Sequence, residues 1–78
     1  HHVDRLREKL LQLAEDHGRV GRDGVVLQLP ITHELLAEMI GSARETVTRA
    51  VDALEQNGFL RRQDRGYVLR VSPGTLER

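Results

Sequence analysis

Hydrophobic residues near the start of the chain recur at the spacing of one helix face. Four of them lie three or four positions apart, with charged residues between them: Val3, Leu6, Leu10 and Leu13. This periodicity is typical of an amphipathic helix. It predicts a helix over 3–17 that ends before Gly18, because glycine suits the position after a helix.

The next segment, 18–24, contains three glycines and no hydrophobic periodicity, which predicts a loop. Its glycine spacing resembles a phosphate-binding loop, but such a loop follows a strand and opens a helix. This segment follows a predicted helix and precedes the hydrophobic run 25–29. A connector is therefore favoured, followed by a strand over 25–29 that Pro30 closes.

Two further helices are predicted with almost no residues between them. Thr32 is a suitable N-cap for the first, which ends at Gly41. The four residues from Ser42 to Glu45 fit a capping box, with Ser42 as the N-cap and Glu45 at the third helical position. Helices joined by so tight a turn must cross steeply, so the stretch 32–57 is predicted to be a helix-turn-helix.

The last hydrophobic runs, 59–63 and 67–71, flank a short polar loop that ends in Gly66. Such a pattern is typical of a β-hairpin, here over 59–71. The order helix, strand, helix-turn-helix and hairpin is that of a winged helix. The predicted fold class is therefore α+β, mainly α: a single winged helix-turn-helix domain over 1–78, with the C-terminal hairpin as the wing.

Composition narrows the classes of function. The chain has 78 residues, no Cys, and twelve Lys and Arg against twelve Asp and Glu. A domain of this size buries only about 60% of the surface of its unfolded chain, which leaves little room for a deep substrate cavity beside a core. The four His show no metal-ligand spacing. We therefore expect that the chain is not an enzyme and that it binds no metal or cofactor. No apolar run reaches about eighteen residues, so we also expect no membrane span.

The zero net charge hides a gradient along the chain. Residues 1–43 carry five basic and seven acidic side chains, whereas residues 44–78 carry seven basic and five acidic ones. All seven basic residues of the second half are Arg, which makes bidentate contacts with phosphate and guanine. The gradient indicates that the second half meets an anionic partner.

The second helix of the pair has two different faces when it is drawn at about 100° per residue. One face carries Val47, Ala50, Val51 and Leu54, and the other carries Arg44, Glu45, Thr48 and Arg49. In the DNA major groove, Arg can bond guanine and Glu can accept from cytosine, so the polar face predicts base contacts. Two simpler explanations stay open for Glu45: the capping box, and an ion pair with Arg49 one turn away.

The predicted wing follows this helix directly and is rich in arginine. A wing beside a recognition helix would reach the phosphates that flank the bases being read. Phosphate contacts are therefore predicted from Arg62 and Arg65.

One stretch is far more specific than a generic helix-turn-helix: residues 41–49, which read Gly-Ser-Ala-Arg-Glu-Thr-Val-Thr-Arg. Together with 31–40 before it and 54–60 behind it, this stretch resembles the C-terminal DNA-binding domain of the Crp–Fnr family. These are bacterial transcription regulators typified by the cyclic-AMP receptor protein. The resemblance covers about residues 3–71.

The resemblance implies roles for individual residues. It implies base contacts from Arg44, Glu45 and Arg49, and phosphate contacts from Thr46, Thr32 and Ser42. Three departures from the prototype bear on the site. Ala43 stands where a Ser is frequent, which removes a hydroxyl near the backbone. His33 stands where the prototype has a phosphate-binding Arg, which implies a weaker or pH-dependent phosphate contact. Thr48 stands where the prototype has Gly, and it adds a fourth side chain to the base-reading face.

The same resemblance implies partners and a larger setting. The half-site for an Arg-Glu-Arg reader in this family is commonly TGTGA-like, in an inverted repeat of double-stranded DNA. Family members are cytoplasmic homodimers with an N-terminal sensor domain and a dimerisation helix, regions that we expect to be absent from this fragment. Activators of the family also touch RNA polymerase, often through the loop corresponding to 16–24. A winged-helix module that binds protein and no DNA is the alternative, for which zero net charge would be natural.

Overall fold

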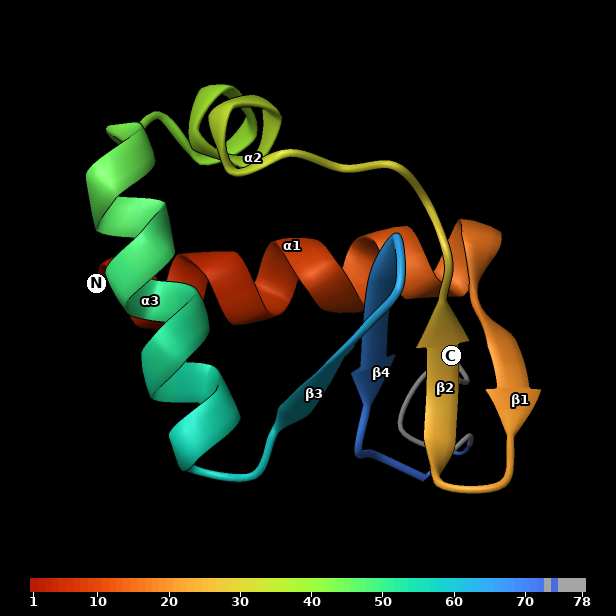
Figure 1. Cartoon of the computed structure of the whole chain (residues 1–78). Coiled ribbons are helices and arrows are strands. Elements are labelled where there is room, and N and C mark those ends of the chain that lie inside the picture. The colour runs from red at the N-terminus through yellow and green to blue at the C-terminus, as the bar shows by residue number, and fades with distance from the viewer. Residues whose placement is uncertain (73, 75–78) are drawn as a thin grey trace.

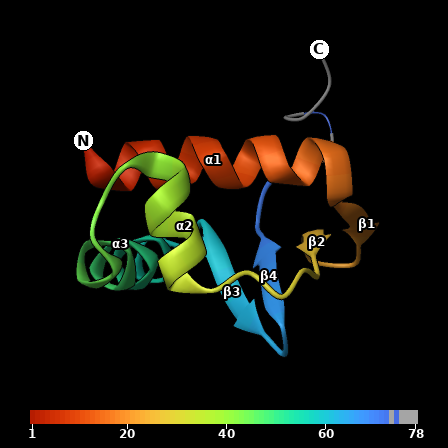
Figure 2. The same cartoon turned by 90° about the horizontal axis from the view of Figure 1, so that it is seen from above.

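Three helices and four strands follow one another in the computed structural model, which describes residues 1–72 and residue 74. Their bounds, in chain order, are α1 (His2–His17), β1 (Arg19–Gly21), β2 (Gly24–Leu27), α2 (His33–Ile40), α3 (Arg44–Gln56), β3 (Leu60–Gln63) and β4 (Gly66–Leu69). The helix α1 spans the width of the molecule, and α3 and the sheet lie side by side in front of it (Figure 1, Figure 2). The predicted fold class, a mainly helical winged helix, is confirmed.

The first helix begins one residue before its predicted range, ends at His17 as predicted and packs behind the rest of the core. Leu6, Leu10 and Ala14 are buried on its inner face. The reason for the glycine at its end differs from the prediction. Gly18 has φ −77° and ψ 157°, an extended conformation open to any residue. A side chain there would lack room, since a Cβ on Gly18 would lie 2.5 Å from the carbonyl oxygen of Ala14.

All four strands form one antiparallel sheet in the order β1-β2-β4-β3. The sheet joins the wing to the strand that precedes the helix-turn-helix, because β2 pairs with β4 through the register Val25 to Leu69. Leu60 lies opposite the same Leu69 from the other side. These three side chains are buried, and with Leu27 and Tyr67 they belong to the core.

The prediction of a plain loop over 18–24 is wrong. Residues 19–21 form the strand β1, which pairs with β2 as far as Gly21 opposite Gly24. The predicted strand over 25–29 begins one residue earlier and ends at Leu27. Pairing with a neighbouring strand decides these bounds, and the composition of 18–24, rich in glycine and arginine, carries no signal of that pairing.

The helix-turn-helix is formed by α2 and α3. In Figure 1, α2 is seen end-on and α3 is seen from the side, so the two helices cross steeply, as predicted. The hydroxyl of Thr32 caps α2 by accepting from the backbone N–H of Leu35 at 3.0 Å. Gly41 ends α2 with φ 67°, and the N–H of Ser42 then donates to the carbonyl of Ala37 at 2.8 Å. These bonds close the turn within three residues.

The predicted capping box at the start of α3 is wrong. The N-cap is Ala43, and no side chain caps this helix. Because the helix begins one residue later than predicted, Glu45 is its second residue rather than its third. The hydroxyl of Ser42 lies instead 2.8 Å from Nδ1 of His2, at the start of α1. A tertiary contact has replaced the local one.

The third helix ends as the sequence predicts, and the wing follows at once. Gly58 has φ 85°, and the N–H of Phe59 donates to the carbonyl of Leu54 at 3.0 Å. In the wing turn the left-handed residue is Arg65, with φ 66°. Gly66 serves another purpose, because a Cβ there would lie 2.1 Å from the carbonyl oxygen of Leu27 in the neighbouring strand.

Candidate nucleic-acid interface

The two faces predicted for α3 are present in the structure. Its inner face buries Val47, Ala50, Val51 and Leu54. Its outer face leaves Arg44, Glu45 and Arg49 exposed, all within the first two turns. The helix is therefore held by its apolar face while three charged side chains project from its N-terminal half.

Neither of the two simpler explanations for Glu45 is met within residues 1–72 and 74. Glu45 makes no capping bond, because the N-cap position is filled by Ala43 without a side-chain bond. It makes no ion pair with Arg49. The guanidinium of Arg49 instead approaches the hydroxyl of Thr46, at 3.5 Å. Both carboxylate oxygens of Glu45 are therefore open to solvent or to a ligand.

Thr48, predicted to face the bases, turns toward α2. Its hydroxyl donates to the backbone carbonyl of Arg44 at 3.1 Å and lies 2.9 Å from Nδ1 of His33. The side chain of Thr48 is half-buried. The structure thus brings Arg44, Glu45 and Arg49 together on one exposed surface and separates Thr48 from them.

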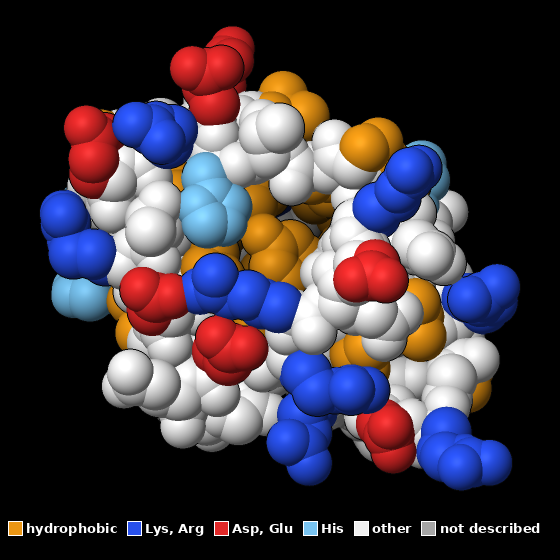
Figure 3. Space-filling model, viewed as in Figure 1, with side chains coloured by type: hydrophobic (Ala, Val, Ile, Leu, Met, Phe, Trp, Pro, Cys, Tyr) orange, Lys and Arg blue, Asp and Glu red, His pale blue; other side chains and the backbone are white. Residues whose placement is uncertain are grey.

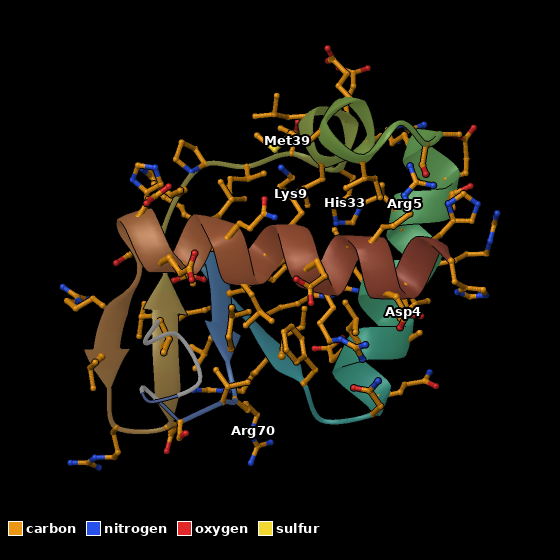
Figure 4. All side chains as sticks on the ribbon, turned by 180° about the vertical axis from the view of Figure 1, so that it is seen from behind. Asp4, Arg5, Lys9, His33, Met39 and Arg70 are labelled. Carbon is orange, nitrogen blue, oxygen red and sulfur yellow. The ribbon has the colours of Figure 1, made fainter. Side chains whose placement is uncertain are left out.

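His33 is the first residue of α2, and its labelled side chain lies on the side of α2 turned toward the rest of the domain (Figure 4). Partial burial lowers its pKa from the ordinary value of 6.5, and the positive charges of Arg62 and Arg44 lower it further, while Asp52 acts in the opposite direction. At neutral pH the imidazole is therefore neutral. It adds no positive charge to the surface at that pH.

The two wing arginines predicted to bind phosphate have different surroundings. Arg62 is in strand β3, and its side chain points toward α3. Its guanidinium pairs with both Asp52 and Glu55, with Glu55 at 3.2 Å. This pairing ties β3 to the helix. Arg65, at the tip of the wing, is exposed and has no ion-pair partner among the described residues.

A groove of about 350 Å³ separates the wing from the segment that leads into α2. Its lining comes from two places: Pro30, Ile31 and Thr32 on one side, and Arg62, Gln63, Arg65, Gly66 and Tyr67 on the other. Figure 3 shows a hollow with a hydrophobic floor on this face, and the basic side chains of its lining are Arg62 and Arg65. Three predicted phosphate contacts, Thr32, Arg62 and Arg65, therefore meet at one groove.

Two further predicted phosphate contacts, Ser42 and Thr46, lie at the opposite end of the helix-turn-helix. Ser42 is in the turn, with its hydroxyl beside His2. Thr46 is half-buried and lines a smaller hollow of about 240 Å³ with His1, His2 and Arg49. A third hollow, of about 370 Å³, lies between α1 and α2 and away from the outer face of α3; the side chains labelled in Figure 4 that line it are Asp4, Arg5, Lys9 and Met39.

The sequence did not reveal the bonding partners of Arg62, Ser42 and His33. Asp52 and Glu55 lie three positions apart on α3, the spacing of one helix face, and this spacing was the available signal for a cation opposite them. No sequence signal pointed to His2 or to the contact between His33 and Thr48, because each joins residues far apart in the chain. Over the part of the chain that the structure describes, no cluster of three metal-ligating side chains occurs. No helix there is long and apolar enough to cross a membrane.

Comparison with known proteins places these features in a family. Residues 4–78 match the model of the Crp-like helix-turn-helix domain. The putative HTH-type transcriptional regulator ycf28 of Porphyra purpurea is 35% identical over 86% of this chain. The regulatory protein CysR of Synechococcus elongatus is 36% identical over 95% of it, and the global nitrogen regulator of the same organism is 42% identical over 72%. These relatives are transcription regulators, not enzymes.

Solved structures agree with this assignment. The CO-dependent transcription factor CooA of Carboxydothermus hydrogenoformans, in an imidazole-bound form, superimposes with a TM-score of 0.76 and 33% identity over 86% of this chain. Reduced CprK gives a TM-score of 0.78 at 17% identity, which shows the shared fold alone. The chain spans 28% of the length of ycf28, 40% of CysR and 32% of the CooA chain.

Proposed function

The chain belongs to the Crp-like helix-turn-helix family, the DNA-binding domains of transcription regulators, and on this premise we propose how it reads DNA. The N-terminal half of α3 enters the major groove of double-stranded DNA. There Arg44, Glu45 and Arg49 contact base edges in a TGTGA-like half-site of an inverted repeat. The observation that carries this proposal is that Arg44 and Glu45, beside Arg49, are exposed and have no ion-pair partner among the described residues, on a helix whose other face is buried.

The chemistry of these three side chains matches the bases of such a half-site. Each Arg can donate two parallel bonds to the two acceptors that guanine shows in the major groove, and Glu can accept from the amino group of cytosine. A TGTGA half-site holds guanines on one strand and a cytosine opposite each of them. Each such pair discriminates against the wrong base by roughly 1–3 kcal/mol.

Phosphate contacts would come from the groups that border α3. Thr32 and Arg65 flank the groove between the wing and α2, while Ser42 and Thr46 lie by the turn and the first turn of α3. Contacts of this kind fix the register of the protein on DNA and carry no sequence information of their own. In this scheme Arg62 acts chiefly through its ion pairs, which hold the wing beside α3.

The test compares binding of the domain to a duplex carrying the inverted TGTGA repeat with binding to a scrambled duplex, by fluorescence anisotropy at low salt. The domain should prefer the repeat. Arg44→Ala should lose roughly 1–3 kcal/mol of binding free energy on the repeat and relax discrimination at one guanine. On the scrambled duplex the same variant should lose much less.

Two results would count against this proposal. Equal loss by Arg44→Ala on both duplexes would reduce Arg44 to a general cation. A folded domain with no duplex binding at low salt would favour the alternative, a winged-helix module that contacts protein only. Selection of bound sites from random duplexes would show, independently of any assumed sequence, whether a motif is enriched.

The relatives are roughly two and a half to three times as long as this chain, so the setting of the whole protein is also a proposal. We infer that it acts as a homodimer, since an inverted repeat presents two equivalent half-sites to a two-fold symmetric protein. RNA polymerase is a second proposed partner. The hairpin of β1 and β2, which includes most of residues 16–24, is the proposed contact surface.

A further inference from the structure

One hydroxyl joins the two helices of the helix-turn-helix, and its single proton fixes the direction of both bonds. Thr48 donates that proton to the carbonyl of Arg44, at 3.1 Å. A hydroxyl has one O–H and two lone pairs. The contact of 2.9 Å with Nδ1 of His33 must therefore be a bond that Thr48 accepts and His33 donates.

This accounting selects one tautomer of His33. The proton of the neutral ring is on Nδ1, and Nε2 carries the lone pair. When the ring takes up a second proton, Nδ1 still carries its own, so the bond to Thr48 has a donor in both protonation states. The chain His33–Thr48–Arg44 therefore keeps its geometry through the titration of the imidazole.

The chain ends on the backbone of the residue that begins α3. Arg44 is the first helical residue, and no side chain caps the helix. Its carbonyl accepts from Thr48 one turn later, and Thr48 is in turn held by the first residue of α2. The first turn of α3 is thus connected to α2 by side-chain bonds as well as by the tight turn.

We propose that His33 and Thr48 are positioning residues, which hold the first turn of α3 at a fixed angle to α2 and so aim Arg44 at its base. Thr48 then influences sequence preference without touching DNA. This inference rests on the proposed function, because it takes Arg44 to be a base reader. It assigns Thr48 a role different from the base contact predicted from the sequence.

The charged groups around His33 come from two elements. Arg44 and Asp52 face it from α3, and Arg62 faces it from β3. Protonation of His33 adds a positive charge to this group without breaking the bond to Thr48. Affinity for any DNA should therefore rise on acidification, while discrimination between bases should stay constant.

The experiment measures one ratio, the affinity for the half-site duplex divided by the affinity for a duplex altered only at the guanine assigned to Arg44. Thr48→Val removes the hydroxyl and keeps the shape, and Thr48→Ser restores the hydroxyl. His33→Leu removes the donor, and His33→Asn keeps an N–H donor near the position of Nδ1. We expect Thr48→Val and His33→Leu each to lower the ratio about three- to tenfold, as for loss of one hydrogen bond.

The matched variants separate positioning from direct contact. Thr48→Ser and His33→Asn should keep most of the ratio, and the double variant Thr48→Val with His33→Leu should lose no more than either single one, because both break the same bond. The wild-type ratio should be equal at pH 7.5 and pH 5.5. The ring nitrogen signals of His33 in NMR spectra should show the proton of the neutral ring on Nδ1.

Each contrary result has a distinct meaning. A wild-type ratio of one would overturn the proposed function itself, and this inference with it. A wild-type preference that Arg44→Ala abolishes but Thr48→Val or His33→Leu leaves intact would overturn the inference alone. So would a neutral His33 with its proton on Nε2, or additive losses in the double variant, which would indicate that Thr48 acts independently of His33.

Discussion

Arg62 and Arg65 lie three residues apart on the wing, yet their surroundings give them different tasks. Arg62 points toward α3 and pairs with Asp52 and Glu55, so its charge is already balanced within the protein. Arg65 is exposed at the turn, and its backbone has φ 66°, a conformation that costs most residues with a Cβ about 1–2 kcal/mol. Residue type alone does not distinguish a structural cation from one free to meet phosphate.

Arg65→Asn should separate the charge of Arg65 from its backbone conformation. Asn tolerates the left-handed region, so thermal unfolding should be unchanged or slightly raised. DNA affinity should fall equally on the duplex with the inverted TGTGA repeat and on the scrambled duplex. The slope of log affinity against log salt concentration should become less steep by about one. Binding isotherms at several salt concentrations measure this slope.

Arg62→Gln is the matched comparison for this variant. It should lower the unfolding temperature, because Asp52 and Glu55 lose their shared partner; each exposed pair contributes roughly 0.2–1 kcal/mol. An unchanged salt slope in Arg65→Asn would make Arg65 an ordinary surface residue.

The pKa of His33 links stability to pH. Burial, and next the charge of Arg62, lower this pKa below its ordinary value of 6.5, which the unfolded chain retains. The unfolded state therefore binds the proton more tightly than the folded state. The contribution of His33 to the free energy of unfolding should be constant above pH 6.5. It should fall as the pH drops from 6.5 through the lowered pKa of His33.

Urea unfolding at pH 7.5 and pH 5.5 checks this dependence. His33→Asn cannot titrate, so it should lose less stability between the two pH values than the wild type does. Comparing the two proteins removes the contribution of the other three His. Equal losses in both would show that His33 titrates with the same pKa in the folded and unfolded states.

At the scale of elements, the turn between α2 and α3 is the decisive local feature. Gly41 adopts φ 67°, and the backbone N–H of Ser42 reaches back to Ala37. This arrangement turns the chain sharply within three residues, and so it sets the steep crossing of the two helices. The angle between α3 and α2 is therefore a consequence of one left-handed residue and of the contacts across the turn.

Gly41→Ala should destabilise the fold by about 1–2 kcal/mol, which is the cost of placing a Cβ in the left-handed conformation. Among the described residues, a Cβ at this position would meet the guanidinium of Arg5 alone, at 3.4 Å, so conformational strain rather than a clash accounts for the loss. Gly41→Asn should cost less, since Asn enters this region more readily. Chemical unfolding curves of the three proteins measure both differences, and equal stability of wild type and Gly41→Ala would contradict the account.

At the scale of the whole molecule, zero net charge is compatible with DNA binding because the charges are arranged unevenly. Acidic residues outnumber basic ones in the first half of the chain, and Arg concentrates on α3 and the wing. A single copy offers few phosphate contacts, so its binding should be weak and should fall readily with salt.

Two copies joined by a long flexible linker should bind an inverted repeat at least about tenfold more tightly than one copy does, because the second half-site is then met at an effective concentration near the millimolar range. The gain should disappear on a duplex with one half-site. It should also disappear when one of the two copies carries Arg44→Ala. Titrations of the linked and single proteins on both duplexes make the comparison, and an equal gain on the single half-site would point to nonspecific attraction instead.

Much of this protein follows from the sequence alone. Helical periodicity located α1, α2 and α3, since each buries one apolar stripe, and two runs on either side of a short loop ending in Gly66 located the wing. The polar face of α3 followed from the same arithmetic, which is why Arg44, Glu45 and Arg49 were identified together. These features depend on residues close in the chain, where spacing and geometry are tightly linked.

Tertiary structure decided what spacing cannot express. The strand β1 exists because β2 pairs with it, the start of α3 has no side-chain cap while Ser42 contacts His2, and the hydroxyl of Thr48 bonds toward His33. Arg62 became part of an ion-pair network with α3. In each case the deciding partner is another element of the fold, and a side chain with two suitable partners takes the one that the folded backbone brings within bonding distance.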